Sequence, residues 1–88
     1  MIDVGVYIIQ RGEGGPIKIG RSASSITRRI QTIQQCAPES LIELARIVDV
    51  RIESSLHEKF RRSRIRGEWF QPHADLIEFI NSIPSRKE

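Results

Sequence analysis

The chain has 88 residues, of which 39% are hydrophobic and 28% are charged, and its formal net charge is +3. This composition is typical of a folded domain and excludes a disordered protein. A domain of this length buries roughly 60–65% of its unfolded surface, which leaves room for one small core. The single cysteine excludes an internal disulfide and a cysteine-rich zinc site, and no apolar run is long enough to span a bilayer.

The first two predicted elements are strands joined by a glycine-rich turn. Residues 3–10 and 17–20 have the pattern of strands, and residues 11–16 between them form the turn. A hairpin brings side chains of its two arms within reach of each other, so Tyr7 and Lys18 are expected to share one platform. A hairpin does not require this pairing, so the two residues are candidates for a chemical role.

A helix and a third strand are predicted next. The helix covers residues 25–35, with Ser24 or Ser25 as its N-cap. Residues 41–48 are rich in apolar and β-branched side chains, which indicates a strand.

Two further helices follow. The second covers residues 51–60, with Asp49 as its N-cap and a buried stripe formed by Ile52, Leu56 and Phe60. The third opens at a capping box in residues 75–78 and is stopped by Pro84.

The predicted fold is an α+β domain with a three-stranded antiparallel sheet flanked by three helices. The domain is expected to cover residues 1–84, and residues 85–88 are expected to be a frayed tail. Cys36 is predicted to be a small packed residue, and His73 is predicted to lie in a loop.

Basic side chains gather in two parts of the chain. One group falls within eight positions and comprises Lys59, Arg61, Arg62, Arg64 and Arg66; the other comprises Arg21, Arg28 and Arg29. Clusters of this kind are the electrostatic footprint of a polyphosphate partner. The alternative is a solvated basic helix end, which complements the helix dipole.

Several short motifs occur in a characteristic order: Gly5-Val6-Tyr7, Lys18-Ile19-Gly20, Arg29, Glu53 and Gly67-Glu68-Trp69-Phe70. In this respect the chain resembles the GIY-YIG nuclease superfamily. It is most similar to the compact phage and bacterial branch whose second motif reads Lys-Ile-Gly. The resemblance covers about residues 4–70, and the order and spacing of the motifs are more specific than any one of them. It implies the superfamily's α+β architecture and a metal-dependent endonuclease that nicks DNA from a single active site.

The resemblance implies that Tyr7 helps to activate the attacking water. A free tyrosine has a pKa of about 10 and is a poor base at neutral pH, but a neighbouring cation favours the phenolate. Lys18 is the candidate for that cation, and it stands where the founding members of the superfamily carry a second tyrosine. The alternative for Tyr7 is a half-buried strand tyrosine that packs on the core.

Arg29 matches the essential arginine of the superfamily. A guanidinium can hold two phosphate oxygens and stabilise the charge of the transition state. The adjacent Arg28 is the alternative register, but the spacing from Ile26 to Arg29 and Ile30 favours Arg29. Arg21 is either a further contact to the strand or an exposed loop arginine.

Glu53 matches the glutamate that binds a metal, Mg²⁺ or Mn²⁺. One carboxylate suffices for Mg²⁺, which keeps most of its waters and takes other ligands from substrate phosphate. The alternative is a surface glutamate in an ion pair. His57 lies one helical turn later on the same face. Its role is open: it is either a residue that supports Glu53, an alternative general base, or a simple surface partner of Glu53.

The chain departs from the wider superfamily after the second helix. An active-site asparagine is absent from the corresponding stretch, and whether Glu68 approaches the site or pairs with Arg66 stays open. Trp69 and Phe70 are expected to fill the core.

The expected partner is DNA, duplex or branched, although RNA is not excluded. The basic stretch would supply salt-dependent, largely non-specific affinity, and a homodimer would be needed for a double-strand cut. No membrane is expected, and neither is a signal segment, so the expected location is the cytoplasm of a bacterial or phage-infected cell. The rival interpretations are a module of the same fold that binds nucleic acid without cleaving it, and a small interaction domain with solvated charges.

Overall fold

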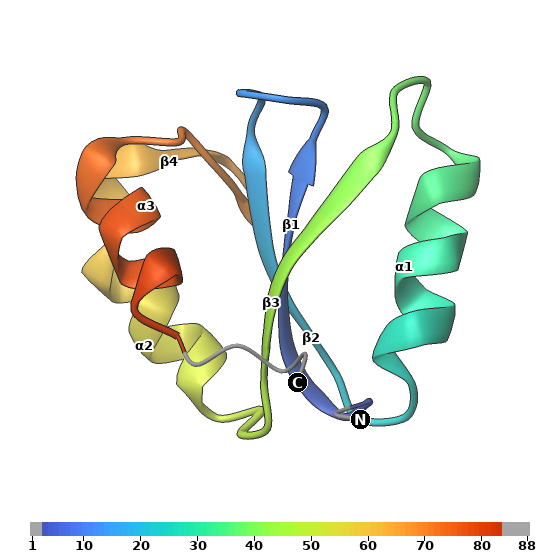
Figure 1. The fold of residues 1–88 in the computed structure, drawn as a ribbon. Helices are drawn as coiled ribbons and strands as arrows, with labels where there is room; N and C mark the ends of the chain where they lie inside the picture. Colours follow the sequence, from blue (N-terminus) through green and yellow to red (C-terminus); the bar gives the residue numbers. More distant parts are fainter. Residues whose placement is uncertain (1–2, 84–88) are drawn as a thin grey trace.

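A computed structural model describes residues 3–83 of the chain (Figure 1). In chain order the elements are β1 (Gly5–Arg11), β2 (Ile17–Ser22), α1 (Ile26–Gln35), β3 (Leu41–Ile47), α2 (Ile52–Lys59), a 3₁₀ turn (Arg61–Ser63), β4 (Arg64–Arg66), β5 (Trp69–Phe70) and α3 (Ala74–Asn81). The α1 helix covers one face of the central sheet, and the α2 and α3 helices cover the other.

The sheet has five strands in the order β3-β1-β2-β5-β4, with every neighbouring pair antiparallel. The prediction of a three-stranded sheet is therefore wrong. Residues 64–70, which were not expected to be strands, form a short hairpin, and β5 pairs with the outer edge of β2 through Ile17–Phe70 and Lys18–Trp69. Strands of three and two residues are too short to show a period-2 pattern, so only their pairing with β2 defines them.

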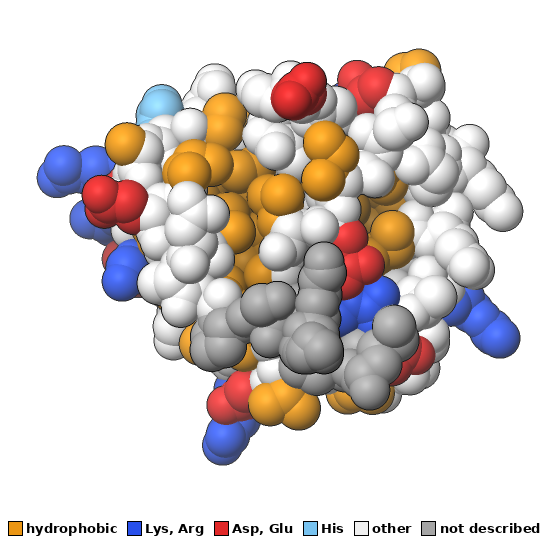
Figure 2. Space-filling view, in the orientation of Figure 1, with side chains coloured by type: hydrophobic (Ala, Val, Ile, Leu, Met, Phe, Trp, Pro, Cys, Tyr) orange, Lys and Arg blue, Asp and Glu red, His pale blue; other side chains and the backbone are white. Residues whose placement is uncertain are grey.

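Two apolar clusters lie on opposite faces of the sheet. Because side chains alternate along a strand, Val6 and Ile8 of β1 point to the α2 and α3 side, and Tyr7 and Ile9 point to α1. Figure 2 shows apolar side chains gathered between α3 and β3. The first cluster is the larger and contains Val6, Ile8, Ile17, Ile19, Ala45, Leu56, Phe60, Phe70, Leu76 and Ile80.

The first residues of the three helices can be compared with the predicted N-caps. Ser25 is confirmed as the N-cap of α1, because its Oγ accepts a hydrogen bond from the backbone N–H of Arg28 at 3.1 Å. Asp49 is not the N-cap of α2; that position is Arg51, whose backbone and side chain both donate to the Asp49 carboxylate. A cap at Asp75 is also wrong, since α3 begins at Ala74.

Other local predictions have mixed outcomes. His73 occupies the N-cap position of α3, and its Nδ1 lies 2.9 Å from Ser63 Oγ. Cys36 is exposed at the C-cap of α1, so the expectation of a packed residue is wrong. Pro84 and the predicted tail 85–88 lie outside the described residues. Between residues 3 and 83, none of the helices is long and apolar enough to cross a bilayer.

Gly5, the first glycine of the motifs, has a structural role in the sheet. Its φ is +134°, and a Cβ at this position would lie 2.0 Å from the carbonyl oxygen of Ile47. Only glycine combines this backbone conformation with so close an approach of β1 to β3.

Candidate active site

The centre of the candidate site is Gly20 on β2, which faces Tyr7 of β1. A Cβ at position 20 would lie 2.5 Å from the Tyr7 Oη and 3.0 Å from Glu68 Oε1. The absence of a side chain at Gly20 therefore leaves the space in which the phenol and a carboxylate come together. Tyr7 itself is 1% exposed, and its ring packs in the cluster under α1.

The site lies where the sheet loses its outer strand. Because β5 has only two residues, it pairs with β2 at Ile17 and Lys18 and no farther. The next backbone N–H, that of Ile19, donates to the carbonyl of Glu68 at 2.9 Å. At this open edge, side chains from α2 can meet side chains from the opposite face of the sheet.

Lys18 and Tyr7 point to the same face, as expected, because Tyr7 pairs with Gly20 and Lys18 pairs with Ile9. The Lys18 ammonium binds Glu68, with Nζ 2.8 Å from Oε1. The Lys18 ammonium therefore lies diagonally across the hairpin from the Tyr7 phenol. Both groups lie close to the Glu68 carboxylate.

The pKa of Tyr7 is raised to about 12, mainly by burial and then by the negative charges of Glu68 and Glu53. The positive charge of Arg29 opposes this rise. The expected lowering of the Tyr7 pKa by Lys18 is therefore wrong in this arrangement, because burial dominates and Lys18 is neutralised by Glu68.

Glu53 projects from α2 toward the open edge of β2 and is only 9% exposed. Its pKa is raised by burial, by a hydrogen bond with Glu68 and by the charge of Glu68, while His57 and Arg21 lower it. The Arg21 Nε lies 3.7 Å from Glu53 Oε1, and the His57 Nε2 lies 3.9 Å from Oε2. Glu53 is thus a buried member of the site rather than a solvated surface residue.

His57 is tied to the sheet. Its Nε2 lies 2.9 Å from the carbonyl oxygen of Ile19, and its ring packs edge-on against Phe70 at 5.1 Å. Since a carbonyl oxygen only accepts, Nε2 must carry the proton of this hydrogen bond. The bond holds α2 against β2 and leaves this nitrogen unable to act as a base while it persists.

Glu68 is the site residue whose place the sequence could not decide. It binds Lys18 and shares a hydrogen bond with Glu53, and among residues 3–83 no Glu68–Arg66 ion pair forms. Burial raises the pKa of Glu68, but the hydrogen bond and charge of Lys18 outweigh it, so the pKa lies below its usual value. The signal that could have located Glu68 is the β4–β5 hairpin, which the sequence pattern did not reveal.

The electrostatics of the site distinguish Arg29 from Arg28. Both side chains are exposed on the first turns of α1. Arg29, and not Arg28, contributes to the pKa of Tyr7, so its charge is directed toward the phenol. The choice of Arg29 over Arg28 and a contact of either arginine with phosphate both stay predictions.

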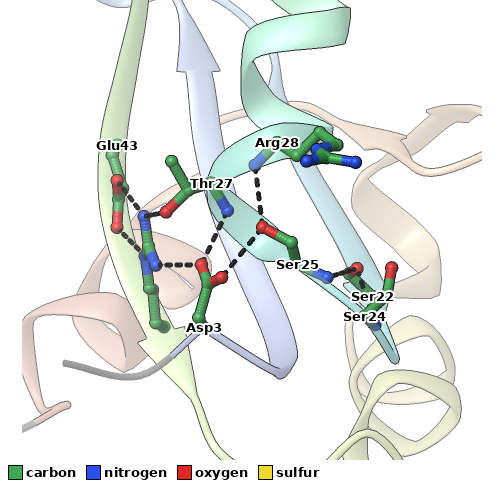
Figure 3. A network of polar contacts seen from close by, with 8 residues as sticks. Asp3, Ser22, Ser24, Ser25, Thr27, Arg28 and Glu43 are labelled. Carbon is green, nitrogen blue, oxygen red and sulfur yellow. Dashed lines mark hydrogen bonds and ion pairs between the residues drawn. The ribbon is translucent and has the colours of Figure 1, made fainter.

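A polar network fixes the start of α1 (Figure 3). The carbonyl of Asp3 accepts from the Ile26 N–H at 2.7 Å, and its carboxylate accepts from the Thr27 N–H at 2.9 Å and from Ser25 Oγ at 2.8 Å. The hydrogen bonds from Thr27 and then from Ser25, with the charge of Arg46, lower the pKa of Asp3 to about 2.

Arg46 of β3 joins this network from beside Tyr7, its partner in the sheet. The buried guanidinium binds Asp3 Oδ1 at 3.1 Å and Thr27 Oγ1 at 3.2 Å, and it also pairs with Glu43. Sequence reasoning missed Asp3 and Arg46, because no local pattern shows that positions 3, 27 and 46 meet.

Comparison with known proteins identifies one family. Residues 5–84 match the T5orf172 domain. The chain belongs to the T5orf172 domain family. This family is phage-associated and is described as nuclease-like. No curated protein and no solved structure matches the chain.

The basic stretch of this T5orf172 domain runs from the end of α2 through the 3₁₀ turn to β4. Lys59 lies beside the Phe60 and Phe79 rings, with Nζ 5.7 and 5.6 Å from their centroids. Arg61 pairs with Glu58 at 3.4 Å, so both basic residues lie at the α2 end.

The remaining basic residues lie on or near the β4–β5 hairpin. Arg62 is exposed in the 3₁₀ turn, and Arg64 Nε donates to the Gly67 carbonyl at 2.7 Å. Arg64 pairs with Phe70 and Arg66 pairs with Trp69, with a shift of register between the two arginines. Their predicted contacts with nucleic acid stay predictions.

The donor set of the T5orf172 site suits a hard cation. No group of three or more His, Cys, Asp and Glu side chains arranged to hold a metal occurs within residues 3–83. Glu53 and Glu68 nevertheless place two carboxyl groups together. Oxygen donors of this kind fit Mg²⁺ or Mn²⁺ with the remaining positions filled by water and substrate phosphate.

Proposed function

We propose that this T5orf172 domain is a metal-dependent endonuclease of the GIY-YIG type that hydrolyses DNA phosphodiester bonds. The observation that carries the proposal is the meeting of a phenol, an ammonium and two carboxyl groups around Gly20 at the open edge of β2. The nuclease-like description of the family supports it.

Arg29 would bind the scissile phosphate. Its side chain is exposed, has no acidic partner among the described residues, and extends its field to Tyr7. A guanidinium in this position holds two phosphate oxygens and stabilises the additional charge of the transition state. Arg21 and Arg28 are nearby candidates for contacts to the same strand.

Tyr7 would orient the attacking water as a neutral phenol. With a pKa of about 12 it stays protonated at neutral pH, and its hydroxyl can both accept and donate a hydrogen bond. Nε2 of His57 donates to Ile19, so the acceptors for the water proton are Nδ1 of His57, which keeps its lone pair in this tautomer, and the Glu53–Glu68 carboxyl pair. Lys18 lies beside this pair and binds Glu68.

Glu53, with Glu68 beside it, would hold the Mg²⁺ or Mn²⁺ ion. When bound, the ion supplies Lewis-acid stabilisation of the charge at phosphorus and on the leaving oxygen. The pKa of Glu53 is raised because its carboxyl group is buried and lies beside that of Glu68. A bound cation would reduce the repulsion between the two negative charges.

The single site is expected to nick one strand of duplex or branched DNA, and a double-strand cut would require a homodimer or a second event. One observation favours a second candidate, a module that binds nucleic acid without cleaving it: the pKa of Tyr7 is raised rather than lowered. An assay of DNA cleavage distinguishes the endonuclease from the binding module.

The test is nicking of supercoiled plasmid by the purified protein with Mg²⁺, with Mn²⁺ and with chelator. Arg29→Ala and Glu53→Ala are expected to abolish metal-dependent nicking. Arg51→Ala and Glu58→Ala are the matched controls, because they remove the same charges from exposed positions outside the site. Nicking that survives both site variants would refute the assignment, and salt-sensitive binding without cleavage would establish the binding module.

A further inference from the structure

The one tryptophan of the chain lies outside the apolar core. Trp69 is half-buried on β5, and neither cluster of apolar residues in the described chain includes it, although its neighbour Phe70 is fully buried. The expectation that both aromatic residues fill the core therefore holds for Phe70 alone. Tryptophan is often only partly buried, so the contacts of the Trp69 ring decide what it can do.

Cations surround the Trp69 ring. The Lys18 Nζ lies 5.5 Å from its centroid, and the Arg11 Cζ lies 5.7 Å from it. Both distances fall within the range of cation–π attraction. Arg66 pairs with Trp69 on β4 and is exposed. Lys18 and Arg11 also pair with Glu68 and Glu39. The ring thus belongs to a strip of charged side chains rather than to an apolar surface, and Arg66 is the member of this strip without an acidic partner among the described residues.

This strip continues from the candidate site. Lys18 pairs directly with Trp69 and binds Glu68, the residue before Trp69 in the chain. Tyr7 lies on the same face, diagonally across β2. A polynucleotide strand whose phosphate is held at the site can therefore extend across β2 and β5 toward Arg66.

We propose that Trp69 is a stacking platform for an unpaired nucleobase next to the scissile phosphate, with Arg66 and Arg11 beside the adjoining backbone. An aromatic ring with flanking cations is the arrangement that binds single strands, because every base offers a face for stacking. A base inside a duplex has both faces covered, so it must first leave the helix. The substrate class is thus a strand with an unpaired base, and this inference rests on the proposed nuclease function for the neighbouring phosphate.

The emission of Trp69 provides a direct test, since the chain has no other tryptophan. The protein is titrated in chelator with three probes: a short oligothymidylate, an abasic strand of equal length, and a blunt duplex of equal length. Oligothymidylate is expected to change the emission and to bind about 5- to 150-fold more tightly than the abasic strand. Equal affinity for these two strands, unchanged emission at saturation, or equally tight binding of the duplex would overturn the proposal.

Variants separate stacking from folding. Trp69→Leu is expected to lose the preference for bases, and Trp69→Phe is expected to keep most of it. Phe79→Leu, an aromatic change on the far side of the sheet, should leave the preference intact; loss there would contradict the assignment. The comparison of strands in the unchanged protein needs no variant, so a misfolded Trp69→Leu does not weaken the test.

The test also distinguishes this inference from the nuclease function. Nicking without any base-dependent binding would overturn the stacking platform and leave the nuclease. Base-dependent quenching in a protein that never nicks would support the platform and refute the nuclease.

Discussion

Tyr7 and Gly20 face each other across β1 and β2, and the Tyr7 hydroxyl occupies the space in which a side chain at position 20 would begin. This relationship links two of the sequence motifs physically. The second motif ends in glycine because the tyrosine of the first motif lies over it. Changes at either position should therefore affect the same site.

Gly20→Ala should displace the phenol, because the new methyl group would lie 2.5 Å from Tyr7 Oη. We expect a loss of about 1–3 kcal/mol in the free energy of unfolding, as for other overpacked positions, together with loss of nicking. Urea denaturation and the plasmid assay measure the two effects. Ser24→Ala, in the exposed loop after β2, is the control. Full stability and activity of Gly20→Ala would contradict the geometry.

The raised pKa of Tyr7 predicts a loss of stability at alkaline pH. The folded state raises the pKa from 10.0 to about 12, so the stabilisation is complete below pH 10 and is lost as the pH rises to about 12. The difference corresponds to about 2–3 kcal/mol. Urea denaturation across this range should show a steeper decline for the native chain than for Tyr7→Phe, which cannot ionise. Parallel curves for the two proteins would refute the burial of the phenol.

The lowered pKa of Asp3 predicts a loss of stability at acidic pH. Its pKa is lowered from 3.8 to about 2, so its contribution is present above pH 4 and disappears as the pH falls toward 2. Asp3→Asn should flatten the dependence of the melting temperature on pH in this range and loosen the start of α1. Glu13→Gln, in the exposed turn between β1 and β2, is the comparison. An unchanged acid profile in Asp3→Asn would show that the network is not formed in solution.

Glu68→Gln tests the carboxyl pair. The change removes the charge that raises the pKa of Glu53 and the ion pair with Lys18. Because the ion pair is only partly buried, we expect a loss of about 0.5–1 kcal/mol in stability. If Glu68 helps to hold the metal, the Mg²⁺ concentration for half-maximal nicking should rise severalfold. Glu58→Gln controls for a lost carboxylate, and equal Mg²⁺ dependence in both variants would exclude Glu68 from the metal site.

Local sequence patterns were sufficient for most of the elements. Apolar alternation and the glycine-rich turn predicted the β1–β2 hairpin, and apolar residues at helical spacing predicted three helices whose bounds differ from the structure by few residues. The candidate site was predicted only in part. Tyr7, Lys18 and Glu53 were named from motifs, and the structure brings them together around Gly20, whereas Glu68 was left undecided.

The sequence by itself determined the periodic elements, because hydrophobic periodicity and turn residues act over a few neighbouring positions. Only the tertiary structure decided the outer strands: β4 and β5 are too short to be stable without β2. It also decided the pKa of Tyr7, since burial beneath α1 outweighs any nearby cation. The joining of Asp3, Thr27 and Arg46 depends likewise on packing, because residues so distant in sequence meet only after the sheet and α1 have formed.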